Sequence, residues 1–322
     1  MIDMEVRPFR EDDYPRHVEI GQLVFPDEVR SLKTARHHDA TWDGERYFRR
    51  RLVAEDGAGQ VVGWGEIHHV PWTFHPDRYR LWLEVDPAVQ RRGVGSVLYE
   101  RLLSEVRAHD AALVRSEAKE SMAESVQFLT RRGFEEAQRS WESRLNVTLF
   151  DFATFAGADE RVARQGIAIT TLAAEGPRDE PVLRAVYELD AECSLDEPSL
   201  DPVTTPPFED WWKQNVEAPN FRPEAWFLAK DGERYVGLSN MSPRLAQPGI
   251  LSQGFTAVQR DYRGRGIAMA LKLQTVRYAR DHSYREIRTD NNARNRPMLR
   301  INEAMGFVKQ PVWITYQKAL RR

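Results

Sequence analysis

Gln90-Arg91-Arg92-Gly93-Val94-Gly95 is a glycine-rich stretch that returns later in the chain as Arg263-Gly264-Arg265-Gly266-Ile267-Ala268. The two copies lie 173 residues apart, counted from Gly93 to Gly266. A Gly-Phe pair keeps the same offset, at residues 133–134 and 306–307. Landmarks that stay in register over this distance indicate two copies of one domain. Because short solenoid repeats run roughly 20–50 residues, a period this long predicts two complete domains.

Length, charge and cysteine content narrow the class of protein. The 322 residues are enough for about two domains, each able to bury its own core. The net charge is −3, whereas a nucleic-acid-binding domain would be clearly basic. The only cysteine, Cys193, cannot form an intrachain disulfide, which favours a reducing compartment. No apolar run approaches the roughly 18 residues of a membrane span, and residues 1–5 are unlike a signal peptide, so we expect a cytoplasmic protein without nucleic-acid or membrane partners.

The segments around the two glycine turns predict the same order of elements in each copy. Each copy opens with a short alternating strand, at residues 4–9 and 167–172, and continues into a hairpin that turns at an Asp-Gly pair, at residues 56–57 and 231–232. A strand then leads into the glycine turn. An amphipathic helix follows the turn, over residues 94–106 in the first copy. A further strand and helix lead to the Gly-Phe pair, so each copy is predicted to be mixed α/β.

A strand that enters a glycine-rich turn and opens a helix makes a binding site for an anion. The first N–H groups of the helix have no partners within it, and the helix dipole adds partial positive charge there. Glycines let backbone N–H groups approach phosphate oxygens, and arginines in both turns add charge. The turns lack the Gly-Lys-Ser/Thr ending of a P-loop and the three glycines of a Rossmann fingerprint. One such turn alone is often a plain tight turn, but two in register favour phosphate binding.

Both turns resemble the acetyl-CoA signature of the GNAT acyltransferases, in which Gln or Arg precedes Gly-x-Gly or Gly-x-Ala. The residues before each turn, 85–87 and 256–258, agree with this resemblance. In the second copy, a helix led by Asn295 and ending at residues 306–307 resembles a later motif of the same superfamily. The resemblance covers nearly the whole chain, as a tandem arrangement similar to that of the mycothiol synthase family.

The resemblance implies two tandem GNAT-like domains, at residues 1–150 and 151–322, each an α/β (α+β) fold with a mixed, mostly antiparallel sheet flanked by helices. It implies an N-acetyltransferase that moves acetyl directly from acetyl-CoA to the amine of an unidentified small molecule, without a metal. The second copy is favoured as the working site, because its turn and Asn295 match the family more closely.

The resemblance also implies a role for each part of the two sites. Backbone around Val85 and at residues 256–258 is expected to pair with the pantetheine arm, Asn295 to bind the same region, and the turns to hold the pyrophosphate. The expected cofactor-binding residues are Val85, Gln90, Arg91, Arg92, Gly93, Val94, Gly95, Ser96, Thr256, Val258, Arg263, Gly264, Arg265, Gly266, Ile267, Ala268 and Asn295.

Neither copy has the acid that many members of the superfamily use for the departing thiolate. Those members place a Tyr shortly before the Gly-Phe pair, where this chain has Leu129 and Asn302. Leu129 has no proton to give, and Asn302 can only donate a hydrogen bond, so Asn302 is the candidate in the second copy. The loss of the usual acid leaves an alternative function, an acyl-CoA-binding module or sensor in which one or both domains are catalytically silent.

Acetyl transfer needs a neutral amine, and a carboxylate can take the proton from the amine, often through water. Glu84, on the strand before the first turn, is our candidate for this base, and Glu66 and Glu117 lie on neighbouring strands. Each of them is equally explained as an ordinary strand-end carboxylate. The second copy has Ala257 in place of Glu84. Its other candidates are Glu192, Asp290 and the C-terminal carboxylate of Arg322.

Two further features each have a functional and a plain explanation. Seven of the eight histidines lie in the first copy, but no metal-ligand spacing accompanies them, so we expect no metal. An acidic, Trp-containing insertion at residues 190–212 would suit a cationic amine, or it is an ordinary helix pair with Trp in the core. We expect a small-molecule amine as the partner and a monomer or homodimer.

Overall fold

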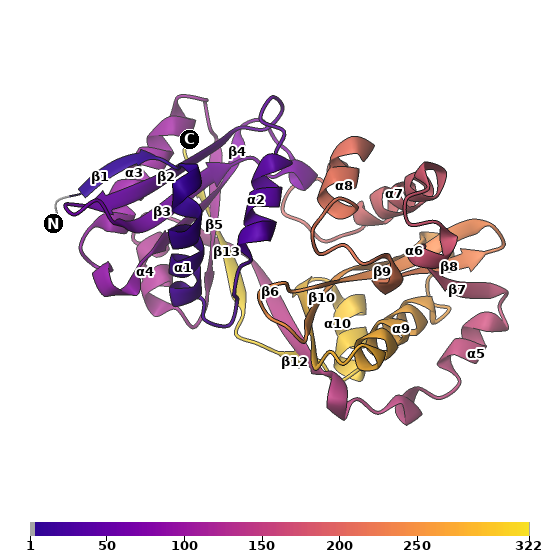
Figure 1. The fold of residues 1–322 in the computed structure, drawn as a ribbon. Helices are drawn as coiled ribbons and strands as arrows, with labels where there is room; N and C mark the ends of the chain where they lie inside the picture. Colours follow the sequence, from indigo (N-terminus) through magenta and orange to yellow (C-terminus); the bar gives the residue numbers. More distant parts are fainter. Residues whose placement is uncertain (1–3, 322) are drawn as a thin grey trace. The chain divides into compact units, whose positions relative to one another are not determined.

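The computed structural model describes residues 4–321 and divides into two compact units (Figure 1). Unit 1 comprises the described residues up to Gln138 together with those from Trp313 onward, and unit 2 comprises Arg139–Val312. The predicted division at residue 150 differs from these units in two places. Residues 139–150 belong to unit 2, and the last strand of the chain belongs to unit 1.

Unit 1 is built on a sheet in the order β1-β2-β3-β4-β5-β13, antiparallel except for the parallel pair β4–β5. Its strands are β1 (Met4–Pro8), β2 (Arg49–Asp56), β3 (Val61–His68), β4 (Arg78–Val85), β5 (Leu113–Lys119) and β13 (Trp313–Ala319). Its α-helices are α1 (Tyr14–Val24), α2 (Leu32–Ala40), α3 (Val94–Arg107) and α4 (Ala123–Thr130).

The two faces of the unit 1 sheet are set by the alternation of side chains along β3. Gly63 faces α3, where an added Cβ would lie only 2.9 Å from Val94 Cγ1, so glycine allows the helix to approach closely. Trp64, the next residue, faces the other way and packs with Ile20 of α1. One face of the sheet therefore carries α3 and the other carries α1.

Unit 2 has a sheet in the order β6-β11-β10-β9-β8-β7, with β12 paired to β6. Its strands are β6 (Glu135–Asn146), β7 (Ile167–Thr171), β8 (Trp226–Asp231), β9 (Arg234–Pro243), β10 (Ile250–Val258), β11 (Glu286–Asn292) and β12 (Val308–Lys309). Its α-helices are α5 (Ala158–Ala163), α6 (Leu172–Glu175), α7 (Glu180–Ser194), α8 (Phe208–Asn215), α9 (Ile267–Asp281) and α10 (Arg296–Ala304).

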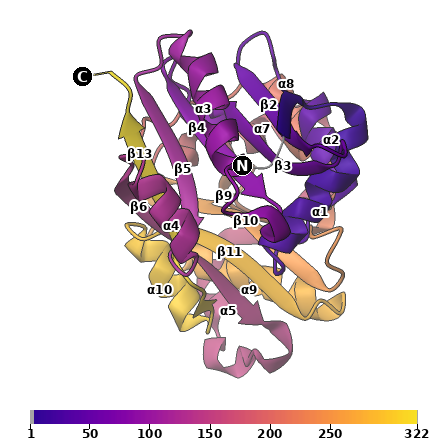
Figure 2. The ribbon, with the colours of Figure 1, turned by 90° about the vertical axis from the view of Figure 1, so that its left-hand side faces the viewer.

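The two copies exchange their last strands. β6 follows α4 in the first copy but pairs with β11 of unit 2, from Ser140↔Asn292 to Asn146↔Glu286. β13 follows α10 in the second copy but pairs with β5 of unit 1 along its full length, and both views show it beside β5 (Figures 1 and 2). Each unit is therefore completed by a strand from the other copy.

The predicted elements around the turns are confirmed. The opening strands, both hairpins, the strand before each turn and the helix after it all form in the predicted segments. The predicted α/β class with a mostly antiparallel sheet is confirmed as well. Within residues 4–321, no helix is long and apolar enough to cross a membrane.

Candidate functional site

The first glycine turn has the conformation that an anion site requires. Arg91 and Gly93 adopt left-handed backbone angles, with φ of 64° and 98°. Gly93 is the N-cap residue of α3, and no side chain caps this helix, so its first N–H groups stay free. Gln90 Nε2 donates to the carbonyl of Val85 at 3.0 Å, which ties the turn to the end of β4.

The second turn repeats this conformation. Gly264 and Gly266 have φ of 76° and 85°, at the positions equivalent to Arg91 and Gly93. Arg263 Nε donates to the carbonyl of Val258 at 2.9 Å. This bond corresponds to the one that Gln90 makes to Val85 in the first copy. The repeat seen in the sequence is therefore a repeat of backbone geometry.

Beside the first turn, two parallel strands separate. β4 pairs with β5 only from Arg78 to Arg80, and β4 then continues five residues further to Val85. Because the N–H of Asp86 bonds to β3, the backbone groups of Leu83 and Val85 point the opposite way, toward the gap left by β5. The gap thus exposes an unpaired strand edge.

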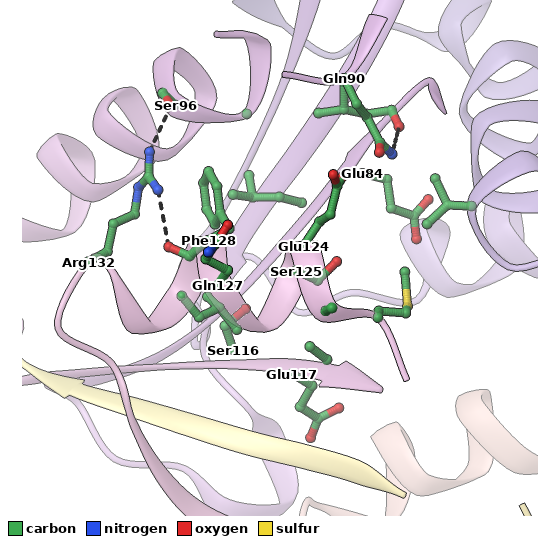
Figure 3. A pocket seen from close by; sticks show the side chains of 18 of the residues that line it. Glu84, Gln90, Ser96, Ser116, Glu117, Glu124, Ser125, Gln127, Phe128 and Arg132 are labelled. Atoms are coloured by element: carbon green, nitrogen blue, oxygen red, sulfur yellow. Dashed lines mark hydrogen bonds between the residues drawn. The ribbon is translucent and has the colours of Figure 1, made fainter. Parts of the chain in front are cut away.

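A cavity of about 690 Å³ fills this gap (Figure 3). On the α3 face it is lined by the glycine turn, by the first turn of α3 and by α4. On the α1 face it is lined by the end of α1 and by the side chains of β4 and β5 that alternate to that side. The lining residues used below are Phe25, Trp82, Leu83, Glu84, Val85, Gln90, Arg91, Gly93, Gly95, Ser96, Glu117, Ser125, Phe128, Leu129, Arg131 and Arg132.

The α3 face of the cavity is basic. Arg91, Arg131 and Arg132 line it, and within residues 4–321 neither Arg91 nor Arg92 has a carboxylate partner. Arg132 donates to Ser96 Oγ at 2.7 Å and lies 3.6 Å from the ring centre of Phe128, which holds its guanidinium at the cavity wall (Figure 3). Free N–H groups and arginines together suit a phosphorylated ligand.

Glu84, the predicted base, lies on the α1 face, and both of its carboxylate oxygens are engaged in hydrogen bonds. Its side chain is buried and accepts four hydrogen bonds. The donors are Arg30 Nη1 and Nη2 at 3.1 and 2.5 Å, Trp64 Nε1 at 3.0 Å and Trp82 Nε1 at 2.7 Å. A carboxylate with four donors on two oxygens has no lone pair left for an incoming amine.

Glu117 is less constrained. It lines the cavity, pairs with Arg80 through one oxygen and accepts from Thr315 Oγ1 at 3.1 Å through the other. A quarter of its side chain remains exposed. Of the carboxylates proposed from the sequence for the first copy, Glu117 is the one that can still accept a proton at the cavity. Glu66 is instead buried against Arg51, which lowers its pKa against the effect of burial.

The position of the missing acid is confirmed as apolar, since Leu129 is buried at the cavity wall. Ser125 lies one helical turn before it on α4 and also lines the cavity (Figure 3). Ser125 was not among the site residues that we expected from the sequence. The signal that identifies it is the helical spacing of four residues, which brings Ser125 and Leu129 to one face of α4.

Comparison with known proteins identifies the family. The sequence model of the acetyltransferase (GNAT) family matches the chain twice, over residues 11–134 and 183–307. The chain belongs to this family. Each GNAT match ends before the strand that the copies exchange. No curated protein matches the chain in sequence.

Solved GNAT structures share the tandem fold. A tandem GNAT protein from the clavulanic acid biosynthesis pathway is 18% identical, with a TM-score of 0.75 over 99% of both chains. A GCN5-related N-acetyltransferase from Sphaerobacter thermophilus is 20% identical, with a TM-score of 0.70 over 99% of this chain and 96% of that one. A putative acetyltransferase from Pyrococcus horikoshii has a TM-score of 0.59 at 15% identity, over 99% and 90%. This chain is thus an acyltransferase of two tandem GNAT domains.

The second GNAT turn has an acidic side chain beside it. Asp196, just after α7, pairs with both Arg260 and Arg263, and these arginines lower its pKa. A pocket of about 160 Å³ lies there, and the carboxylates of Glu192 and Asp196 face it. Among the described residues, no carboxylate pairs with Arg91 or Arg92 of the first turn in this way.

The other predicted residues of the second copy serve the structure of unit 2. Asn295 caps α10, accepting from the N–H of Met298 at 3.4 Å. Asn302 is buried and donates to Asn291 Oδ1 at 2.6 Å, which ties α10 to β11. Thr256 Oγ1 lies 2.8 Å from Ser239 Oγ within the core. Among these three, none lines either of the cavities described above.

The acidic insertion of the second copy forms a packed helix pair. Trp211 of α8 is buried in the core and donates to Asp190 of α7 at 2.7 Å. Burial raises the pKa of Asp190. Glu192 accepts from Gln259, Asp290 is exposed on β11, and Arg322 lies outside the described residues. Within residues 4–321, no group of three or more metal-ligating side chains is found.

Proposed function

We propose that unit 1 binds acetyl-CoA and transfers its acetyl group directly to the amine of a small molecule. The observation that carries this proposal is the cavity that passes through the gap between β4 and β5. Its basic end lies at a turn with free N–H groups, and its other end reaches Glu117 on the α1 face. Its volume is within the range of about 300–1,000 Å³ that is common for ligand pockets.

The residues of unit 1 fit each part of acetyl-CoA. The turn from Gln90 to Gly95 and the first N–H groups of α3 would hold the pyrophosphate, with Arg91 and Arg132 nearby. The edge of β4 offers the N–H and C=O groups of Leu83 and the N–H of Val85 to the amides of the pantetheine arm, as a neighbouring strand would, while the carbonyl of Val85 accepts from Gln90. In this proposal the thioester would lie near the opening to the α1 face.

The transfer would proceed on that face. The amine loses its proton to Glu117, directly or through a water molecule, and attacks the thioester carbonyl. The new C–N bond forms and the C–S bond breaks, and the second proton that the attacking nitrogen loses passes through solvent to the departing thiolate. Ser125 can donate a hydrogen bond to the thiolate, at the place where Leu129 cannot.

Unit 1 therefore replaces the second copy as our proposed working site. In unit 2, Asp196 already pairs with Arg263 of the turn and with the preceding Arg260, and its carboxylate would repel phosphates from the same pocket. The closer sequence match of the second copy concerned the turn residues and Asn295, whereas Asp196 lies just after the end of α7, far from the turn in sequence.

The test is release of CoA thiol from acetyl-CoA with a panel of amines. We expect turnover by the wild type and a fall in kcat of about 10²–10⁴-fold in Glu117→Gln. Glu100→Gln, an exposed change on α3, is the control and should match the wild type. Binding of acetyl-CoA without turnover of any amine would contradict the enzyme and favour an acyl-CoA-binding module.

A further inference from the structure

We infer that the acceptor carries its primary amine on a flat apolar group, as an arylalkylamine does. This inference rests on the proposed function of unit 1. It is carried by three aromatic rings, Phe25, Trp82 and Trp313, that meet on the α1 face. They come from the end of α1, from β4 and from the exchanged strand β13.

The rings form one wall, and the Lys119 ammonium lies over two of them, 5.5 Å from the centre of Phe25 and 5.0 Å from that of Trp313. Phe25 and Trp82 line the cavity, and their centroids lie 5.9 Å apart at an interplanar angle of 38°. Trp313 lies 5.5 Å from Phe25 and 5.9 Å from Trp82, at angles of 37° and 38°. Such offset spacings are those of packed aromatic pairs, so the wall is preformed.

Glu84 fixes this wall in place. Its carboxylate accepts from the indole of Trp82, and its partner Arg30 lies 6.0 Å from the centre of the same ring. With Trp64 also bound to the carboxylate, Trp82 cannot turn without breaking a buried network. Glu84 thereby acts as a positioning residue for the acceptor wall, beside the cavity but without touching the reacting amine.

Charges on this face are balanced. Glu84 pairs with Arg30, Glu117 with Arg80, and Lys119 with Glu28 at 2.9 Å. Of the described residues, Glu124 of α4 is a further carboxylate that lines the cavity. The rings offer no acceptors for the hydroxyl groups of an aminosugar, which would lose hydrogen bonds to water on entering.

An apolar wall also favours the chemistry. Removal from water disfavours the ammonium form, so an amine held against the rings loses its proton more readily. Glu117, which lies on the same face, then accepts a proton from an ammonium group whose charged form is already disfavoured. Shape and reactivity therefore select the same class of acceptor.

The experiment compares four amines with the full-length protein and acetyl-CoA: 2-phenylethylamine, 2-cyclohexylethylamine, glucosamine and spermidine. We expect kcat/KM for 2-phenylethylamine to exceed that for glucosamine and spermidine by at least about tenfold. Phe25→Leu should raise KM for 2-phenylethylamine about 2–10-fold and leave KM for acetyl-CoA unchanged. Trp72→Leu, at a Trp that is 52% exposed outside the cavity, is the matched control.

The outcomes separate the two proposals. Preference for glucosamine or spermidine, or an equal effect of Phe25→Leu on all four amines, overturns the acceptor class while the transferase stands. If the wild type does not bind acetyl-CoA, the proposed transferase activity is contradicted. In that case the aromatic wall can still be tested by quenching of Trp fluorescence with 2-phenylethylamine. We expect quenching in the wild type and weaker quenching in Phe25→Leu. No quenching in the wild type overturns the proposed acceptor class.

Discussion

Glu84 is a carboxylate at the position expected for a base, but its oxygens are engaged in structural hydrogen bonds. It lies where the sequence analysis expected a base, on the strand before the turn, yet Arg30, Trp64 and Trp82 occupy its oxygens. Glu117, two β-strand positions from the end of β5, keeps part of its carboxylate free. At the residue scale, the difference between a structural and a reactive carboxylate is its set of hydrogen-bond donors.

Replacing Glu84 by Gln should therefore cost stability. Removing one partner of a buried ion pair leaves Arg30 unpaired and should lower the free energy of unfolding by about 3 kcal/mol, measured by urea denaturation. In the folded protein kcat should stay near the wild-type value in Glu84→Gln and fall in Glu117→Gln. The opposite result would make Glu84 the base.

The sequence could predict the turn residues because their conformation is local. Gly93 and Gly266 have positive φ, as a glycine-rich turn before a helix requires. The sequence could not predict that Arg30 pairs with Glu84, or that Asp196 pairs with Arg263, because each pair joins residues more than 50 positions apart. Side-chain partners set by the tertiary fold leave no short-range pattern.

At the scale of elements, α9 carries a buried lysine in the core of unit 2. Lys272 is 1% exposed, and its Nζ donates to Gln253 Oε1 at 3.4 Å and lies 4.9 Å from the ring centre of Phe307. Gln253 is bound in turn to Ser239 and Thr275, so the helix meets the sheet through a polar network. Burial lowers the pKa of Lys272 to about 7, from its ordinary 10.5.

This lysine should make stability depend on pH. Between about pH 7 and 10.5 the unfolded chain binds the proton that folded Lys272 has lost, so stability rises with pH, by up to about 1.4 kcal/mol per unit. Urea unfolding at pH 7, 8 and 9 should show this rise in the wild type and a flatter dependence in Lys272→Met. Identical slopes in the two proteins would mean that the folded state keeps Lys272 charged.

Hairpins were equally predictable from local residues. The Asp231-Gly232 turn forms as expected, with φ of 57° at the glycine. In the first hairpin, Asp56 Oδ1 accepts from the N–H groups of Ala58 and Gln60, and the positive φ falls on Gly59. The separation of β4 from β5, which makes the cavity, was not predictable, since the short pairing of these strands joins residues 35 positions apart, such as Arg78 and Leu113.

At the scale of the whole molecule, the exchanged strands make each sheet depend on both copies. β5 has β13 as its antiparallel neighbour, and β13 also supplies Trp313 to the aromatic wall. A repeat of 173 residues indicates two domains but does not show which sheet each last strand joins. Dividing the chain at residue 150, as the repeat suggests, would therefore remove β13 from unit 1.

A fragment of residues 1–150 should accordingly fold poorly. Without β13, the edge of β5 is unpaired and prone to aggregation. A permuted fragment, with residues 313–322 joined by a flexible linker after residue 138, should be soluble and melt cooperatively, as measured by circular dichroism. A well-folded 1–150 fragment with no gain from the added strand would show that the exchange contributes nothing to unit 1.

The central claim is that unit 1, and not unit 2, holds acetyl-CoA. The direct measurement is a calorimetric titration of acetyl-CoA into the wild type and into Gly93→Val, Gly266→Val and Gly59→Val. All three glycines have positive φ, but Gly59 lies at a hairpin tip with no atom within 4 Å of an added Cβ, which makes it the control for backbone strain. We predict one site per chain, lost in Gly93→Val and kept in the other two variants. Binding that survives in Gly93→Val and disappears in Gly266→Val would contradict the claim.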